Sequence, residues 1–245
     1  MANALRPILH IADTPEAVVD KLAHFVQATA EAAVARHGRF DIALSGGQTP
    51  RALYGLLAER HADTMPWHAI HFFFGDERYV PSDHPESNAR MAAEAMLDHV
   101  PTPREQVHPM PTHHADRAEA AEEYEAHLRR HFAGGGPHFD LVLLGIGADG
   151  HTASLFPNSP VLDERVGWVA PADGPTDPRQ RLTLTYPALN AARLVAFLAI
   201  GPDKTGPVGA ALAPRPDRHR TPAAGVRPSD GEVYWWLDGA AAARL

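Results

Sequence analysis

The sequence contains no cysteine among its 245 residues. Disulfide bonds and thiolate chemistry are therefore excluded, and a reducing compartment is expected, with the cytoplasm as the default. No apolar run approaches the ~20 residues of a membrane-spanning helix, and the amino-terminal stretch lacks the apolar core of a signal peptide. We therefore expect neither a membrane partner nor a secretory leader.

Positive charge is also scarce, because 22 lysines and arginines stand against 30 aspartates and glutamates, which gives a net charge of −8. This balance argues against a nucleic acid as the main partner, and an anionic substrate would need a local pocket of cations. The 16 histidines are scattered, and no spacing of the H-E-x-x-H kind occurs. We therefore expect no metal site, and we expect most of the histidines to be solvated surface residues.

The stretch at residues 139–157, FDLVLLGIGADGHTASLFP, organises the rest of the chain. It opens on a nearly uninterrupted apolar run, which is typical of a strand buried on both faces of a parallel sheet. A glycine-rich turn follows and carries Asp149 and His151. Turns at the carboxyl ends of strands form the ligand crevice of open α/β sheets, so this turn is a candidate catalytic site.

Two other interpretations of this turn stand beside the catalytic one. GIGADG matches the G-x-G-x-x-G pattern of dinucleotide-binding folds, but that pattern must lead directly into a long helix. Pro157 and Pro160 follow too soon for such a helix to form. A structural His151, held by nearby backbone groups, is left open by the spacing alone.

A second glycine-rich turn follows the short strand predicted at residues 40–44. It consists of Ser45, Gly46, Gly47, Gln48, Thr49 and Pro50. Thr49 is predicted to cap the next helix and Pro50 to occupy its first position. Free backbone N–H groups and the helix dipole make such a turn a ready anion site, especially for phosphate.

Charged residues mark three further predicted strands. Asp76, Glu77 and Arg78 follow the apolar strand at residues 69–74, Lys204 follows the one at 193–200, and Arg181 opens the alternating segment at 181–186. Each group is open to two interpretations, a solvated surface group or part of a substrate site.

Predicted helices and strands alternate along the chain. Besides the strands above, helices are predicted from Thr14 to Gly38, after Thr49, at residues 87–99 and at residues 114–132, with a last strand at 232–237. The alternation predicts an α/β fold with a doubly wound, mostly parallel, Rossmann-like sheet flanked by helices. Because no internal repeat or low-complexity linker interrupts it, we expect one domain over residues 1–245.

Taken together, the segments at the strand ends resemble the 6-phosphogluconolactonase family. The matching segments, in the family's order over residues 40–240, are LSGGQTPRALY, FFFGDERYVPSDHPESNARMA, LVLLGIGADGHTASLFP, RLTLTYPALNAAR and GPDK. Glucosamine-6-phosphate deaminases share the fold, but Arg78 stands where their pattern has Tyr, and no Glu follows His151. One departure from the lactonase pattern is Gln48, where Ser is usual, which removes a hydroxyl donor and leaves the backbone donors.

The resemblance implies hydrolysis of 6-phospho-D-glucono-1,5-lactone to 6-phosphogluconate in the oxidative pentose phosphate pathway. His151 would be the general base and Asp149 would orient it. The implied substrate and phosphate contacts are Ser45, Gly46, Gly47, Thr49, Asp76, Arg78, Arg181 and Lys204. No cofactor is implied, and a monomer or weak homo-oligomer is expected. An amino-sugar-phosphate isomerase/deaminase and a non-catalytic sugar-phosphate sensor remain as alternatives.

Overall fold

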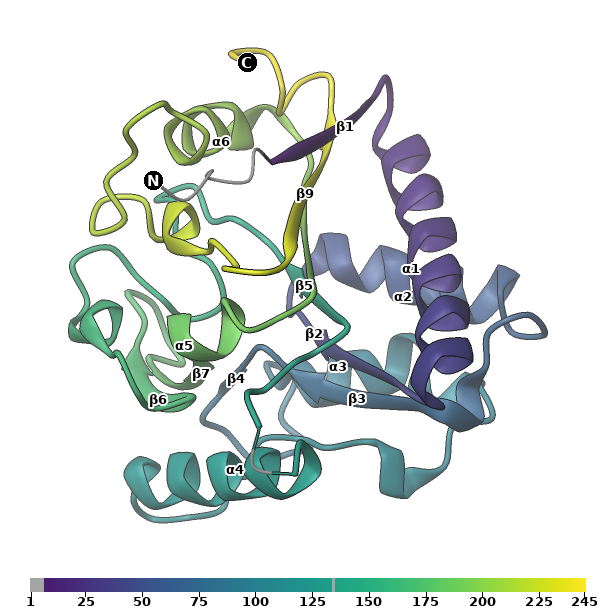
Figure 1. Ribbon diagram of the computed structural model, residues 1–245. Coiled ribbons are helices and arrows are strands. Elements are labelled where there is room, and N and C mark those ends of the chain that lie inside the picture. Colours follow the sequence, from purple (N-terminus) through teal and green to yellow (C-terminus); the bar gives the residue numbers. More distant parts are fainter. Residues whose placement is uncertain (1–6, 134) are drawn as a thin grey trace.

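The structure is a computed structural model that describes residues 7–133 and 135–245. Its centre is a six-stranded sheet in which every pair of neighbouring strands is parallel (Figure 1). In spatial order the strands are β1 (Ile8–Ala12), β9 (Glu232–Asp238), β8 (Leu194–Ala199), β5 (Leu141–Leu144), β2 (Phe40–Leu44) and β3 (Ile70–Phe74). This confirms the predicted fold class.

The order of the strands changes direction between β2 and β5. From β2 the chain continues to β3 at one edge of the sheet, whereas from β5 it continues through β8 to β9 toward the other edge. Because the strands are parallel, the carboxyl ends of β3, β2, β5 and β8 meet side by side. A reversal of this kind opens a crevice between the two middle strands, which is where such sheets bind ligands.

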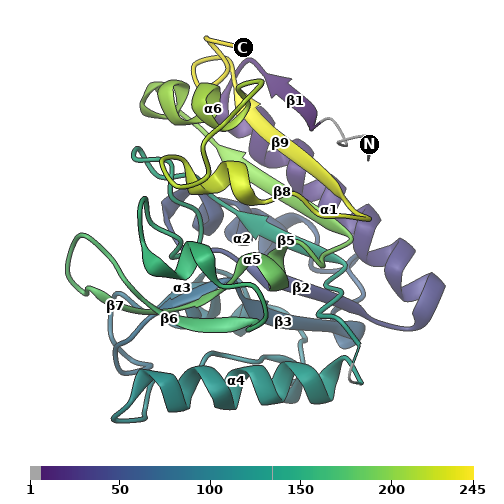
Figure 2. The same cartoon turned by 60° about the vertical axis from the view of Figure 1, so that its left-hand side comes forward.

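Helices cover both faces of the sheet. Figures 1 and 2 show α1 (Pro15–His37) and α2 (Gln48–Arg60) on one face, with α3 (Asn88–Ala95) beside α2. The opposite face carries α5 (Tyr186–Leu189), α6 (Thr205–Ala211) and a second, antiparallel sheet, along which α4 (Arg117–His131) packs. The second sheet consists of β4 (Asp76–Arg78), β7 (Gln180–Leu184) and β6 (Val169–Asp173).

The ends of α1 follow from the residues that cap it. The Thr14 side chain accepts a hydrogen bond from Ala17 N at 3.2 Å, and Pro15 occupies the first helical position. Gly38 ends the helix with a φ of 86°, a left-handed conformation that costs glycine little. The predicted start and end of this helix are confirmed.

The start of α2 differs from the prediction. The helix begins at Gln48 with Gly47 as its N-cap residue, so Thr49 lies inside the first turn and Pro50 is the third helical residue. The prediction of a Thr49 cap was wrong because the turn closes at the glycine, which adopts a φ of 110°. Pro50 is still tolerated, since the first N–H groups of a helix have no partner within it.

The strand predicted at residues 181–186 corresponds to β7, but the sequence predicts neither β1 nor the antiparallel pairing that makes the second sheet. β1 is an edge strand with three exposed apolar side chains, Ile8, Leu9 and Ile11, and it pairs only with β9 from the far end of the chain. By contrast, β5 is buried along its whole length, as its composition predicted. None of the helices in the described ranges combines the length and apolarity needed to cross a bilayer.

Candidate active site

His151 lies in the turn that follows β5, at the point where the strand order reverses. Its Nδ1 is 2.6 Å from Oδ1 of Asp149, and the same carboxylate oxygen accepts a hydrogen bond from the His151 backbone N–H at 3.0 Å. A Cβ at Gly147 would overlap both the His151 ring and the Asp149 carboxylate. Only glycine therefore allows the turn to fold the imidazole back onto the carboxylate.

The Asp149 carboxylate is held in its ionised form. Burial by itself would raise its pKa, but the His151 backbone N–H and the His151 ring lower it, and the net shift is downward. An ionised partner at Nδ1 keeps a proton on that nitrogen, which leaves the Nε2 lone pair as the ring's acceptor. The side chain of His151 is 33% exposed, so water can reach the ring.

Phe156 and Arg181 extend the site away from His151. The Phe156 ring centroid is 4.7 Å from that of His151. A Cβ at Gly174 would lie 3.3 Å from both the Phe156 ring and Arg181 Nε. The guanidinium of Arg181 is therefore close to the aromatic ring that packs on the candidate base.

Arg181 and Arg78 face each other across the second sheet. They are paired residues of the antiparallel strands β7 and β4. Arg181 is only 7% exposed, and its Nη1 is among the buried polar atoms that have no hydrogen-bond partner within the described part of the chain. Burial, followed by the charge of Arg78, lowers the pKa of Arg181. Two close cations and an unpartnered buried donor favour an anionic ligand.

Asn88, at the start of α3, joins the segments that carry these cations. Its Oδ1 accepts a hydrogen bond from Arg78 Nη1, and its Nδ2 donates to Asp76 O at 2.9 Å. A Cβ at Gly46 would overlap the Asn88 amide, so this packing requires glycine at the second position of the Ser45 turn. The Asp76 carboxylate also accepts a hydrogen bond from Ser154 Oγ at 2.6 Å, which links β4 to the His151 turn.

Sequence reasoning missed Asn88, Ser154 and Phe156 as parts of the site. Each lies within a segment that resembles the lactonase family, which was the one signal that could have identified it. Glu77, in contrast, is structural. It is 2% exposed, and its carboxylate accepts hydrogen bonds from the backbone of Arg78, Asn88 and Ala89 and from the Ser87 hydroxyl. Burial raises its pKa against the effect of these four bonds.

The Ser45 turn is fixed by Tyr54. Ser45 N donates to the Tyr54 hydroxyl at 2.9 Å, and that hydroxyl donates to Ser45 O at 2.8 Å. Gly47 offers no side-chain cap to α2, so the first N–H groups of this 13-residue helix face away from any capping oxygen. The turn keeps the character of an anion site.

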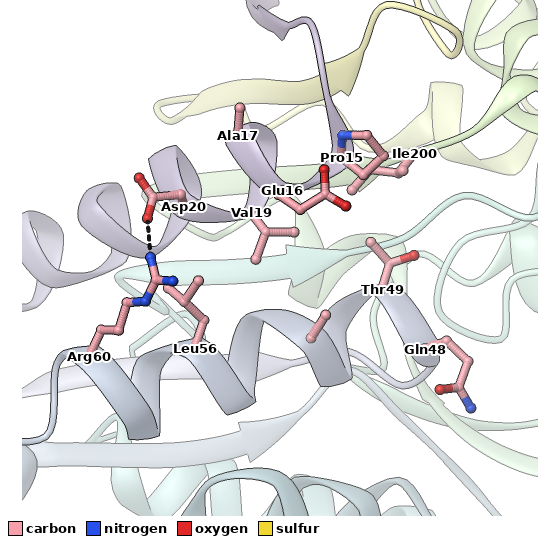
Figure 3. A pocket seen from close by; sticks show the side chains of 11 residues that line it. Pro15, Glu16, Ala17, Val19, Asp20, Gln48, Thr49, Leu56, Arg60 and Ile200 are labelled. Atoms are coloured by element: carbon pink, nitrogen blue, oxygen red, sulfur yellow. Dashed lines mark hydrogen bonds and ion pairs between the residues drawn. The ribbon is translucent and has the colours of Figure 1, made fainter.

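Thr49 and Lys204 are less closely connected to the other predicted residues. Thr49 lines a pocket of about 620 Å³ between α1 and α2, together with Pro15 and Ile200 (Figure 3). Lys204 follows β8, the neighbour of β5, and its Nζ is 2.8 Å from Asp203. Both therefore lie at the carboxyl edge of the sheet, whereas the contacts described above join Gly46, Asp76, Arg78, Arg181 and His151.

Metal-ligand geometry is not found around His151. Among the described residues, two clusters have ligand atoms close enough to share an ion, and neither includes His151 or Asp149. The arrangement can support acid–base chemistry by an oriented imidazole next to a pair of cations.

Comparisons with known proteins identify the family to which this chain is similar. The family model described as glucosamine-6-phosphate isomerases/6-phosphogluconolactonase matches residues 13–235. A 6-phosphogluconolactonase from Synechocystis is 48% identical over 216 residues, which are 87% of this chain and 88% of that protein. The structure of 6-phosphogluconolactonase from Trypanosoma cruzi has a TM-score of 0.88 at 31% identity and covers 99% of this chain and 98% of its own. A monomeric glucosamine-6-phosphate deaminase shares the fold, with a TM-score of 0.82 at 19% identity over 97% of this chain and 100% of its own.

Proposed function

The chain belongs to the glucosamine-6-phosphate isomerase/6-phosphogluconolactonase family, and we propose that His151 carries its reaction. That reaction is the hydrolysis of 6-phospho-D-glucono-1,5-lactone to 6-phosphogluconate, a step of the pentose phosphate pathway. The protein is an enzyme with 6-phosphogluconolactonase activity. The observation that carries the proposed mechanism is the 2.6 Å contact between His151 Nδ1 and Asp149, which leaves Nε2 free to act on water.

The chemical steps follow from the roles of the two ring nitrogens. Nε2 of His151 takes a proton from a water molecule while the water oxygen attacks the lactone carbonyl carbon. The tetrahedral intermediate then breaks the bond from that carbon to the ring oxygen, and the imidazolium returns its proton to the departing ring oxygen. Asp149 stabilises the imidazolium between these steps and keeps the ring oriented.

We assign the substrate phosphate to the cations and backbone donors around the crevice. Arg78 and Arg181 present adjacent guanidinium groups, and Lys204 approaches from the end of β8. The Ser45 and Thr49 hydroxyls, the backbone N–H groups of Gly46 and Gly47 and those of the first turn of α2 supply further donors, whereas the Ser45 N–H is already bonded to Tyr54. These groups provide the local positive pocket that a chain of net charge −8 requires.

Asp76 does not contact the phosphate in this proposal. A carboxylate repels phosphate, and the oxygens of Asp76 already accept hydrogen bonds from Ser154 and Asn88. We infer that it positions Asn88, which in turn accepts a hydrogen bond from Arg78. Asp76 then contributes to substrate binding through the orientation of the arginine.

The residues after His151 favour a lactonase over a deaminase. The segment Thr-Ala-Ser-Leu-Phe-Pro contains no carboxylate, and its Phe156 ring packs against the imidazole ring, with centroids 4.7 Å apart. A second acid–base group for ring opening of an amino sugar is therefore missing from this turn. A non-catalytic sensor has no need for the ionised Asp149 beside a partly exposed His151.

One paired assay tests the function. Purified protein is given 6-phosphogluconolactone in one arm and glucosamine 6-phosphate in the other, with acid release and ammonia release measured side by side. We expect lactone hydrolysis above the spontaneous rate and no ammonia. Stoichiometric ammonia release would overturn the lactonase assignment, and inactivity in both arms with intact sugar-phosphate binding would favour the sensor.

The domain organisation, the oligomeric state, the cellular location and the lack of a cofactor are also proposals. We propose that residues 1–245 act as one domain, that the protein is a monomer or weak homo-oligomer, and that it works in the cytoplasm without a cofactor. Light scattering of the purified protein across a concentration series tests the second of these. Cell fractionation with a specific antibody tests the third.

A further inference from the structure

Three histidines from distant parts of the chain converge at the amino edge of the sheet, opposite the candidate active site. His71 is the second residue of β3, His108 lies in the connection to α4, and His131 is the last residue of α4. One ring nitrogen from each lies within 4.8 Å of the other two. Figure 2 shows α4 running beside β3, the arrangement that brings His131 to the strand.

The spacing of the nitrogens is close to that of a metal site. Nδ1 of His71 and Nε2 of His108 are 3.0 Å apart and face each other. Zn–N bonds of ~2.0–2.1 Å in a tetrahedral site place two nitrogens about 3.4 Å from each other. The three nitrogens, each within 4.8 Å of the other two, are therefore near the spacing that one ion would require.

Two further side chains orient the ligand rings. Asp41 Oδ1 is 2.7 Å from Nε2 of His131, and His127 Nε2 is 3.0 Å from the remaining nitrogen of His108, Nδ1. A carboxylate or ring bonded to the second nitrogen of a histidine fixes its orientation and is the usual support of a ligating imidazole. The charge of nearby Arg39 is balanced, because its Nε donates to Asp41 Oδ2 at 2.9 Å.

The surroundings favour the neutral form of His71 and His108. The Phe73 ring stacks on His108 with centroids 4.4 Å apart, and all three histidines are partly buried. Burial, followed by the neighbouring histidines, lowers the pKa of His108 to about 3, and burial lowers the pKa of His71. Neutral imidazole is the form that binds metals. The expectation that most histidines are solvated is therefore wrong for this cluster.

We propose that His71, His108 and His131 form a binding site for a divalent transition-metal ion of the zinc type, which ties β3 to the carboxyl end of α4. Three nitrogen ligands suit Zn²⁺, Co²⁺, Ni²⁺ or Cu²⁺ and do not suit Mg²⁺ or Ca²⁺, which prefer oxygen. Water completes the coordination. The site is distinct from the His151 turn, because it lies at the opposite ends of the strands.

The experiment measures binding of Zn²⁺ itself to chelator-treated full-length protein by titration calorimetry. We expect one ion per chain. His71→Gln and His108→Gln each remove one ligand, so each should weaken binding by more than the ~10–100-fold typical of a lost supporting residue. His127→Ala should fall within that smaller range. Co²⁺ in place of Zn²⁺ should give the intense visible absorption of a tetrahedral nitrogen site in the wild type and lose it in His71→Gln.

Matched controls come from the other histidines of the chain. Exposed His113, half-buried His114 and Glu123 form the second cluster with ligand atoms close enough to share an ion. Zn²⁺ affinity should be unchanged in His113→Ala and in His151→Ala. Circular dichroism checks that each variant is folded, and the melting temperature of the wild type should rise with added Zn²⁺ while that of His108→Gln does not.

Three outcomes would overturn the proposal. Unchanged Zn²⁺ affinity in folded His71→Gln and His108→Gln would show that the cluster is only a hydrogen-bonded array of histidines. Loss of binding in His113→Ala would move the site to this second cluster. No Zn²⁺ binding to the wild type, by calorimetry or by the melting shift, would exclude a site of this kind altogether.

Discussion

Two of the short histidine–aspartate pairs lie in opposite settings. At the carboxyl edge of the sheet, His151 and Asp149 are 2.6 Å apart, and their side chains are 33% and 42% exposed. At the amino edge, His131 and Asp41 are 2.7 Å apart and only 11% and 3% exposed. The His151 ring is open to water in a glycine-rich turn. The His131 ring faces other imidazoles and packs among aromatic rings. The same pair is therefore suited to proton transfer in one place and to a ligand role in the other.

The two edges also differ in how their charges are balanced. At the amino edge, buried Asp140 lies close to three basic side chains, with His37 at 2.9 Å, Arg193 at 3.5 Å and Arg36 at 3.8 Å. At the carboxyl edge, Arg78 and Arg181 lie next to each other, and Arg181 keeps an unpartnered buried donor within the described residues. Paired charges at the amino edge contribute to stability. Adjacent cations at the carboxyl edge favour the binding of an anionic substrate.

The largest expected effect is the loss of the proposed base. His151→Ala should lower kcat by ~10²–10⁴-fold, because a general base typically contributes that much, while the phosphate contacts keep KM nearly unchanged. Initial rates are measured with spontaneous lactone opening subtracted.

His37 provides a matched control at the other edge. Its side chain is 32% exposed and its Nε2 is 2.9 Å from Asp140, so it resembles His151 in exposure and in having a carboxylate partner. His37→Ala should keep the wild-type kcat. Asp149→Asn should lose less activity than His151→Ala, because the base remains. Near-wild-type kcat in folded His151→Ala would mean that the histidine is structural.

The next effect concerns the cations at the carboxyl edge of the sheet. Arg78→Ala and Lys204→Ala should each lower kcat/KM. The loss should correspond to about 1.5–3 kcal/mol of transition-state binding, the usual value of a hydrogen bond to a charged group. Arg193→Ala, which removes a cation from the amino edge, should leave kcat/KM unchanged. The measurement is repeated with a lactone that lacks phosphate. If that substrate is slowed equally, Arg78 and Lys204 are not phosphate contacts.

A smaller effect is the pH dependence of the free energy of unfolding, which arises from the buried histidines at the amino edge. In the metal-free protein the pKa of His108 is about 3, and the pKa values of His71 and His127 are also lowered, first of all by burial. The unfolded chain, with ordinary histidines near ~6.5, binds more protons below that pH, so the free energy of unfolding should decrease from pH 6.5 toward pH 3. The charged and titratable groups that act on His108 are His71, His127, His131 and Asp41.

Urea denaturation at a series of pH values measures this dependence. His108→Asn should flatten it, because the largest shift is removed. A slope in His108→Asn equal to that of the wild type would show that the buried histidines do not control acid stability.

The smallest expected effect is that of chelation on catalysis. Because the proposed metal site lies at the amino edge, prolonged chelator treatment should leave kcat unchanged, even where it lowers the melting temperature of metal-loaded protein. Activity that disappears with the chelator and returns with a divalent ion would contradict the separation of the two edges.

Local patterns in the sequence were enough to predict the elements that end at the carboxyl edge. The apolar run of β5, the glycines after it and the His151–Asp149 spacing act within a few residues of each other, as do the Thr14 and Gly38 caps of α1. Such features depend on backbone conformation and on nearby hydrogen bonds, which the order of residues fixes directly.

Other features depend on partners that only the packed sheet supplies. β1 pairs with β9, Arg181 is set opposite Arg78, and Asn88 meets Gly46 only because the chain folds back on itself. The same is true of the three histidines at residues 71, 108 and 131, whose spacing resembles no metal motif. Burial of the apolar faces brings these segments together, so a contact between them has no local pattern from which it could be predicted.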